Sequence, residues 1–454
     1  MIDITKPMWF VGVPDESEHS SRIMNIVNIK QYLLRQHKIL TRQDFTFKEQ
    51  TYITAKTVLN SIKSVVNFHT AYTIGTPLEL QGNSDIVNAF KKIIKRGGYS
   101  KVDYELVGDL VKYGNSYEYI YVSPEGKIKS KIICPEDSYP IYDQNYQYVA
   151  FLEFWEDRDS GTSNYIVYYP DRVETWENTT LIDTSINLTG LPIHYASLDK
   201  SEYNHFGDAG LLDLIGIMDA IEKLLGKLDD AITTLSLNPI GVATGQSLAD
   251  SSINRDVVGA VVSLEDGGSF QYANSMMDYQ NIKLLLETYL EQFYAVACIP
   301  ASLIGSSSIS NISEVSLKLM LIQTDNKAHQ NIQVLKEGIY KRLEIFNKLM
   351  KYVGQTEFPE DDFDTVEIVF SSNRPTDSTT IMNQIKTQWE MNAISRQTIL
   401  DISPFIIDTQ LELDRLDEEG IGVNAVINNV VNVGGSGSTV SKKDAGVSDN
   451  NSNE

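Results

Sequence analysis

One stretch of the chain, residues 209–235, restricts the possible folds more than any other. Its apolar residues recur at alternating steps of three and four, the spacing of one face of an α-helix. That row consists of Leu211, Leu214, Met218, Ile221, Leu225, Leu228, Ile232 and Leu235. A second row beside it consists of Leu212, Ile215, Leu224 and Ala231. The stretch therefore predicts a helix of about 40 Å that needs neighbours on more than one side. A central core helix of one large domain would also meet that need.

A short segment with strand-like composition follows this helix and leads away from it. Residues 240–243 and 257–264 have strand-like composition, and Gly267 with Gly268 marks a turn. A second helix is expected from about residue 277, and Pro300 ends it. Its apolar face consists of Ile282, Leu285, Tyr289, Phe293 and Val296. The chain is thus predicted to go out along one long helix and to return along another.

A loop and a third long helix come next. Residues 304–313 are rich in Gly, Ser and Asn, a composition that predicts a mobile loop. Asn311 and Glu314 have capping-box spacing and open a helix of roughly 60 Å that runs to about residue 353. Its apolar row consists of Ile332, Leu335, Ile339, Leu343, Phe346 and Leu349 or Met350.

The first half of the chain predicts helices and then strands. Helices are expected at residues 23–40, 55–70, 84–96 and 102–112. Residues 116–195 alternate with period two and are separated by turns, which predicts an antiparallel sheet. Tyr117, Tyr119 and Tyr121 lie on one side of its first strand, and Glu118, Ile120 and Val122 on the other. The fold class is therefore α+β.

Six short motifs occur along the chain in a fixed order. They are Asn67, Tyr72, Gly75 and Pro77; Gly114, Ser116 and Tyr117; Pro135, Pro140, Ile141, Tyr142 and Asp143; Phe370, Asn373, Pro375 and Asp377; Ile394, Ser395 and Thr398; and Asp408, Glu412 and Arg415. With the order of helices and loop, they resemble the portal proteins of tailed bacteriophages, of the siphovirus type. One departure is at Glu314 and Ser316, where the family often has Gly and Ala.

The resemblance implies a portal fold with an α/β wing, a two-helix stem, a small β-containing clip, a long wing helix and a helical crown. The implied boundaries are a flexible lead at 1–22, wing at 23–208, first stem helix at 209–236, clip at 237–275, second stem helix at 276–299, tunnel loop at 300–313, long wing helix and return strand at 314–376, crown at 377–431 and a disordered tail at 432–454.

The same resemblance implies a function for the assembled protein. Copies of the chain would form a ring of twelve at one capsid vertex of the virion, through which double-stranded DNA enters and leaves. The apolar row from Leu211 to Ile232 would then be the seam between subunits. The loop residues would face the channel: Ile304, Gly305, Ser306, Ser307, Ser308, Ile309, Ser310 and Asn311. Implied partners are terminase, a head-completion adaptor, and the major capsid and scaffold proteins.

The net charge, the apolar content and the cysteines of the chain bear on other functional classes. The net charge of −23 argues against ordinary nucleic-acid binding but suits a conduit whose walls repel the duplex. No apolar run is long enough to span a membrane, and no secretion signal is expected at the start of the chain. Cys134 and Cys298 lack a partner motif, so free thiols in a reducing compartment such as the host cytoplasm are expected.

No catalytic, cofactor or metal site is predicted. Tyr121 and Ile221 stand where a phosphate-binding loop would need its leading glycine. The six histidines lack metal-ligand spacing, and the acidic group Glu360, Asp361, Asp362 and Asp364 is expected to be a solvated loop. Two alternatives stay open. One is another virion structural protein of the tail or baseplate, and the other is a metal-dependent nuclease built on that acidic group.

Overall fold

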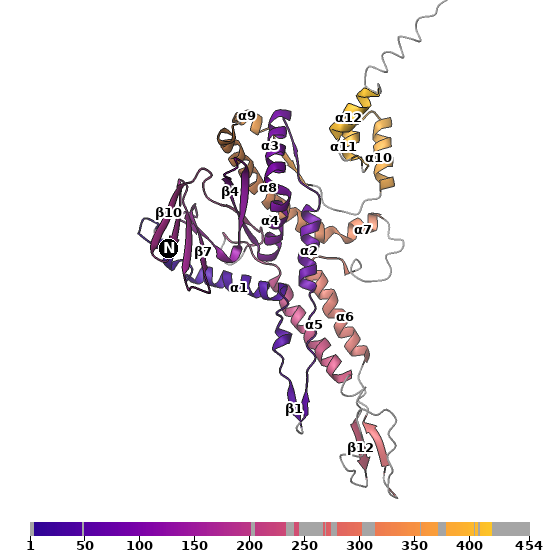
Figure 1. Ribbon diagram of the computed structural model, residues 1–454. Helices are drawn as coiled ribbons and strands as arrows, with labels where there is room; N and C mark the ends of the chain where they lie inside the picture. Colours follow the sequence, from indigo (N-terminus) through magenta and orange to yellow (C-terminus); the bar gives the residue numbers. More distant parts are fainter. Residues whose placement is uncertain are drawn as a thin grey trace, which may run out of the picture. The chain divides into compact units, whose positions relative to one another are not determined.

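The computed structural model describes residues 4–47, 50–200, 205–232, 240–244, 267, 269–273, 279–301, 314–354, 356–370, 378–403, 405–406 and 409–419. It divides into two units, Met1–Arg374 and Pro375–Glu454. Helices and antiparallel strands both contribute to the first unit, so the α+β class is confirmed (Figure 1). The predicted loop residues 302–313, the strand at 257–264 and the tail at 432–454 lie outside the described residues.

The sheet predicted at residues 116–195 is in fact two sheets. One has the order β11-β4-β5, and the other has the order β10-β9-β8-β7-β6. Their strands are β4 (Asn115–Val122), β5 (Ile128–Ile133), β6 (Ser138–Tyr142), β7 (Tyr148–Glu156), β8 (Ser163–Tyr168), β9 (Arg172–Glu177), β10 (Thr180–Ile186) and β11 (Ile193–Ala196). The division falls at the 3-10 helix η3 (Pro135–Asp137), which separates β5 from β6.

The alternation predicted for the first of these strands, β4, is confirmed. Ile120 lies in the large core under α8 (Ile322–Met350), whereas Tyr117 packs on Phe151 and Tyr168 of the five-stranded sheet. The two faces of β4 therefore join the two sheets to one body.

Helices α2 (Ser61–Ile74), α3 (Ser84–Gly97) and α4 (Tyr99–Tyr113) surround α8 (Figure 1). The bounds of α3 agree with prediction: the Asn83 side chain caps its first turn by accepting from the amide of Asp85 at 3.1 Å. Gly98 ends it with a φ of 73°, which favours glycine. Opposite the end of α8, β14 (Glu367–Val369) pairs with β3 (Glu79–Gln81) after the short helix α9 (Glu360–Phe363).

The third long helix was predicted from residue 314 to about residue 353, and the structure is helical between these bounds, with one interruption that was not predicted. The structure has α7 (Glu314–Met320), α8 and the 3-10 helix η6 (Lys351–Val353), with an interruption at Leu321. Leu321 has φ −82° and ψ 0° and is buried with Tyr72 and Ala328. Burial of this side chain, rather than helix propensity, sets the direction of the chain there. The predicted apolar row of α8 is buried as expected.

The flexible lead predicted at residues 1–22 is largely ordered. The structure has η1 (Trp9–Gly12) and begins α1 (Ser17–Leu33) six residues earlier than predicted. Phe10 packs against Tyr165, and the indole of Trp9 donates to the hydroxyl of Tyr169 at 2.9 Å. These aromatic contacts fix a segment whose polar composition had suggested a loose end. After α1 come η2 (Lys38–Thr41), β1 (Phe45–Phe47) and β2 (Gln50–Tyr52).

The second unit holds three helices, α10 (Ser378–Glu390), α11 (Arg396–Ile402) and α12 (Thr409–Glu418). They agree with the helices predicted in this region. Ser395 caps α11 by accepting from the amide of Thr398 at 3.2 Å, which explains the spacing of the Ser-x-x-Thr motif.

Candidate functional site at the two-helix hairpin

The apolar stretch at residues 209–235 forms α5 (Leu212–Ala231), which begins three residues later than predicted; residues 233–235 lie outside the described residues. It lies beside α6 (Tyr279–Val296), which returns along it (Figure 1). Between them in the chain, β12 (Ile240–Thr244) and β13 (Ser269–Ala273) pair antiparallel. The out-and-back order expected from the sequence is therefore present, with an antiparallel pair of strands between the two helices.

The predicted seam divides into two parts. Its first four members are buried inside the chain against α1, α2 and Phe293 of α6: Leu211, Leu214, Met218 and Ile221. Leu225 and Leu228 are half-buried, and Ile232 is 42% exposed. Only the second part of the row is therefore open to a neighbouring molecule.

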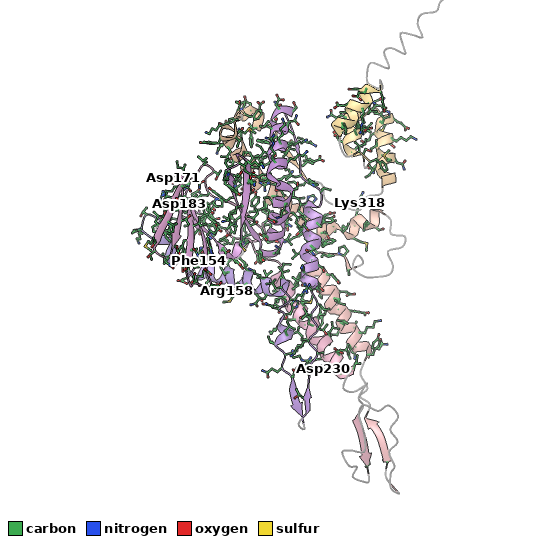
Figure 2. The ribbon with its side chains drawn as sticks, viewed as in Figure 1. Phe154, Arg158, Asp171, Asp183, Asp230 and Lys318 are labelled. Atoms are coloured by element: carbon green, nitrogen blue, oxygen red, sulfur yellow. The ribbon has the colours of Figure 1, made fainter. Side chains whose placement is uncertain are left out.

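Acidic side chains of α5 hold the segment that follows α1, residues 34–47 and 50–60, called the strap here. Glu222 accepts from His37 Nδ1 at 2.7 Å and from the amide of Leu59 at 2.8 Å. Asp230, labelled in Figure 2, pairs with Arg42 and accepts from the amide of Ala55 at 2.8 Å. Each end of the strap is thus fixed to the helix.

Glu222 is a buried carboxyl, and burial raises its pKa. One of its oxygens has no partner among the described residues, while the other receives both donors. Sequence reasoning missed this arrangement. The available signal was a glutamate next to Ile221, on the apolar side of a helix otherwise predicted to be buried.

The end of α6 and the start of α8 are joined to each other. Cys298, with φ 54°, ends α6 in a Schellman motif in which the amide of Ile299 donates to the carbonyl of Tyr294 at 3.0 Å. The Cys298 carbonyl then accepts from the Thr324 hydroxyl of α8 at 2.6 Å. The predicted loop, Ile304 to Asn311, falls between these two anchored helices and outside the described residues.

A buried ion-pair network fixes α8 on the three-stranded sheet. Arg342 is 1% exposed; its Nη1 lies 2.5 Å from Asp103 Oδ1 on α4, and its Nε lies 2.9 Å from Glu118 Oε1 on β4. Glu118 also accepts from the hydroxyls of Tyr195 and Ser130, both at 2.6 Å. Burial alone would lower the pKa of Arg342, but the carboxylates of Asp103 and Glu118 hold it well above its ordinary value. The guanidinium is therefore a permanent part of the core.

One member of the acidic group Glu360, Asp361, Asp362 and Asp364 contacts a neighbouring helix. Asp362 accepts from the side-chain amide of Asn83 at 3.1 Å, which joins α9 to the start of α3. Among the described residues, the one group of metal-ligand types close enough together is Cys134, Glu136 and Asp137. There Glu136 is paired with Lys30, and burial raises the pKa of Asp137 to about 6 and that of Cys134 to about 11. Such raised pKa values oppose cation binding.

A family model described as "Phage portal protein, SPP1 Gp6-like" matches residues 14–424 of the chain. The chain belongs to the phage portal protein family. This portal protein is therefore a structural component of a phage virion, a head–tail connector, and its family is not one of enzymes. No protein with a curated description matches it.

Solved structures that match this portal protein include three chains of gene transfer agent (GTA) particles. A chain of the virion of a native GTA particle is 11% identical, with 83% of this chain and 92% of that chain covered and a TM-score of 0.47. A chain from the neck of an empty particle, computed with C6 symmetry, is 11% identical over 77% and 88%, with a TM-score of 0.45. A chain from the neck of a native particle, computed with C12 symmetry, is 12% identical over 74% and 85%, with a TM-score of 0.44.

One motif of this portal protein has a clear structural role. Gly114 ends α4 with φ 70°, and a Cβ there would lie 2.2 Å from the carbonyl oxygen of Asp208. The next residue, Asn115, accepts from the amide of Gly207 at 3.0 Å and donates to its carbonyl at 2.9 Å. The motif thus fixes the chain just ahead of α5. Among the described residues, no helix has the length and apolarity needed to cross a membrane.

Proposed function

We propose that copies of this portal protein form a closed ring of about twelve at one vertex of the capsid, with a channel for double-stranded DNA. The observation that carries the proposal is an apolar surface on α6. Leu284 is 62% exposed and Leu285 is 43% exposed, on a helix whose other face already packs on α5. Large apolar side chains gathered on one surface mark an interaction site.

The buried half of the α5 row restricts where a neighbour can bind. Leu214 and Met218 are covered within their own chain, so the subunit contact uses the outer face of α6 and the second half of the row. Leu225, Leu228 and Ile232 would there meet Leu284 and Leu285 of the next copy. The proposed seam is thus narrower than the one drawn from the sequence.

Each remaining region has a proposed role. Residues 237–275 form the clip, which binds terminase during packaging and a head-completion adaptor afterwards. Residues 23–208 and 314–376 form the wing, and residues 377–431 form the crown. The wing and crown contact the major capsid and scaffold proteins. Residues 304–311 line the channel, where Ser and Asn side chains touch DNA weakly. The net charge of −23 supports a conduit that repels the duplex rather than one that grips it.

The test combines mass measurement in solution with negative-stain imaging. The wild-type protein should give rings with a central hole and a mass near twelve times 51.0 kDa. Leu284→Glu should give single subunits, because a charge cannot be buried in an apolar contact without a partner. Met24→Glu, at an exposed position of α1, is the control and should still give rings.

Two results would contradict the proposal. One is a wild-type protein that stays a single subunit at every concentration reached. The other is a Leu284→Glu variant that assembles as well as Met24→Glu, which would place the contact away from α6.

A further inference from the structure

The strand β10 forms an open edge of the five-stranded sheet. It pairs with β9 alone among the described strands, and all seven of its residues are exposed. The opposite edge of the sheet is β6, which is buried at four of its five positions. An uncovered edge presents backbone N–H and C=O groups that another strand can pair with.

An apolar layer continues onto this edge without cover. On β9, Trp176 packs against Phe10 of η1, and its cross-strand partner on β10 is Leu181. Residues paired across antiparallel strands share a face of the sheet. Ile186 is paired with Arg172 on the same face. Leu181 is 46% exposed and Ile186 is 81% exposed, so this part of the apolar layer is open to a partner.

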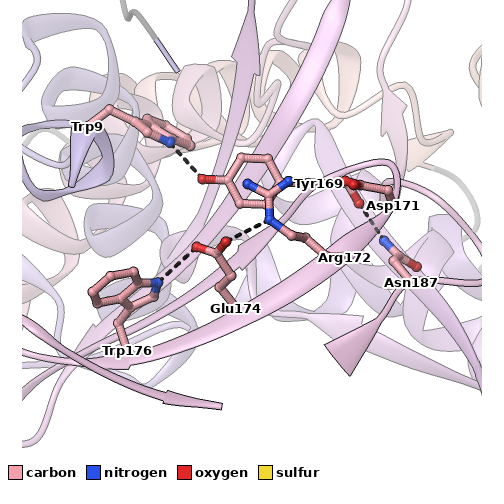
Figure 3. Close-up of polar contacts among 7 residues, drawn as sticks. All are labelled: Trp9, Tyr169, Asp171, Arg172, Glu174, Trp176 and Asn187. Atoms are coloured by element: carbon pink, nitrogen blue, oxygen red, sulfur yellow. Dashed lines mark hydrogen bonds and ion pairs between the residues drawn. The ribbon is translucent and has the colours of Figure 1, made fainter. Parts of the chain in front are cut away.

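A polar network makes this edge rigid (Figure 3). Glu174 accepts from Arg172 Nε at 2.7 Å and from the indole of Trp176 at 3.2 Å. The guanidinium of Arg172 lies 3.9 Å from the ring centre of Tyr169. The amide of Asn187 donates to the carbonyl of Asp171 at 2.9 Å, so the chain after β10 is fixed to the turn before β9. A preformed edge loses little entropy when it binds a partner.

The charge in the sequence around this edge is mostly negative. Between residues 153 and 183 the sequence has Glu153, Glu156, Asp157, Asp159, Asp171, Glu174, Glu177 and Asp183 against Arg158 and Arg172. Arg172 is already paired with Glu174 and Asp171. Asp183 on β10 and Glu177 beside it are exposed and have no ion-pair partner among the described residues (Figure 2). The edge is therefore complementary to a basic segment.

The usual protections of an edge strand are few here. The sequence of β10 has neither Lys nor Pro, and its one irregularity is a bulge at Ile182, between Leu181 and Asp183. Residues 183–186 pair regularly with β9 and leave a regular edge outward.

We propose that β10 binds an extended, basic segment of another protein by strand addition. The segment pairs its backbone with residues 183–186 and places alternate apolar side chains beside Ile186 on the Phe10 face. Its lysine or arginine side chains lie on the opposite face, near Asp183 and Glu177. This surface is separate from α6, so the inference does not depend on ring formation.

The probe is the acetylated and amidated peptide Lys-Val-Lys-Ile-Lys-Val-Lys, used with the full-length protein. Two control peptides carry glutamate in place of every lysine, or N-methyl groups on alternate backbone amides. Binding is followed by calorimetry, and the binding site by hydrogen exchange of residues 180–186. The lysine peptide should bind and slow exchange there at least tenfold, whereas neither control peptide should bind.

Variants then separate strand addition from charge attraction alone. Ile186→Lys should weaken binding of the lysine peptide at least tenfold, because it removes the apolar contact and adds a like charge. Met24→Lys adds the same charge on α1 and should leave binding unchanged.

Three results would overturn the proposal. The first is equal binding of the N-methylated peptide, which would indicate charge attraction without backbone pairing. The second is absence of protection at residues 180–186 at millimolar lysine peptide. The third is full protection of β10 without any peptide, which would show that a second copy of this chain already covers the edge.

Discussion

Replacing Arg342 by Met should destabilise the first unit by about 3–5 kcal/mol at pH 7.5, the usual cost of removing one partner from a buried ion pair. The change retains most of the side-chain volume but leaves Asp103 and Glu118 in the core without their cation. Both carboxyls are almost fully buried, so water cannot replace the guanidinium.

Protonation of Asp103 sets an upper limit to the part of this cost that comes from that residue. In the variant, Asp103 can enter the folded state as a neutral acid. Doing so at pH 7.5 costs about 5 kcal/mol, at 1.36 kcal/mol for each pH unit above its ordinary pKa of 3.8. Burial already raises the pKa of Asp103 in the wild type, which Arg342 opposes. The folded variant then binds one more proton than its unfolded chain, so its stability rises as the pH falls.

This gives the prediction a pH signature. Relative to wild type, Arg342→Met should recover about 2.7 kcal/mol between pH 7.5 and pH 5.5. The assay is urea unfolding at matched protein concentration, followed by tryptophan fluorescence. Lys341→Met is the control, since Lys341 is exposed and pairs with Glu337 one turn away, a contact worth about 0.3–0.5 kcal/mol. A loss below 1 kcal/mol for Arg342→Met, or a loss independent of pH, would refute the electrostatic account.

Two further predictions concern stability. Gly338→Ala should destabilise the protein by about 1–3 kcal/mol, because the new Cβ would lie 2.1 Å from the ring of Tyr195. Gly216→Ala on α5 has open space and should stabilise the protein by up to about 1 kcal/mol. Urea unfolding compares the two variants, and equal effects would contradict the close packing of α8 on β11. His19 is buried, and burial is the main reason that its pKa is lowered to about 3, so below pH 6.5 the unfolded chain takes up a proton that the folded chain does not. This group should therefore lower wild-type stability by about 1.4 kcal/mol for each pH unit below 6.5. His19→Gln should remove that part of the pH dependence in unfolding curves at pH 7.5, 6.5 and 5.5, and an unchanged pH dependence would contradict the prediction.

Much of the fold could be predicted because apolar periodicity reports local geometry directly. The row of α8 and the alternation along β4 are both confirmed, since a side chain's direction follows from its position in a helix or strand. The Ser395 cap and the Gly98 helix end are equally local. Each depends on contacts within a few residues.

The predictions that are wrong depend on contacts between distant residues. The ordered start of the chain rests on Trp9 and Phe10 meeting strands about 155 residues later. The interruption at Leu321 depends on Tyr72 of α2. The division of the sheet in two depends on how Tyr117 packs against Phe151, although Pro135 did mark the position. No short window of sequence contains these contacts.

The two helices α5 and α6 of the candidate site were predicted by the same reasoning, but the contacts between them and the rest of the chain were not. The row on α5 was correctly identified as apolar on more than one side, yet the sequence could not show which part faces α1 and which part stays open. The buried charges were missed for a related reason. Arg342 lies between Ile339 and Phe346 at core spacing, but an arginine on a helix is usually solvated, and its two acidic partners are more than 200 residues earlier.

These polar contacts between helices and strands bear on the rigidity of the portal subunit. Arg342 fixes α8 to β4, and Thr324 fixes the start of α8 to the end of α6. Glu222 and Asp230 fix the strap to α5. Because fully satisfied polar networks make a core rigid, the two helices α5 and α6 and the helix α8 should move as one frame.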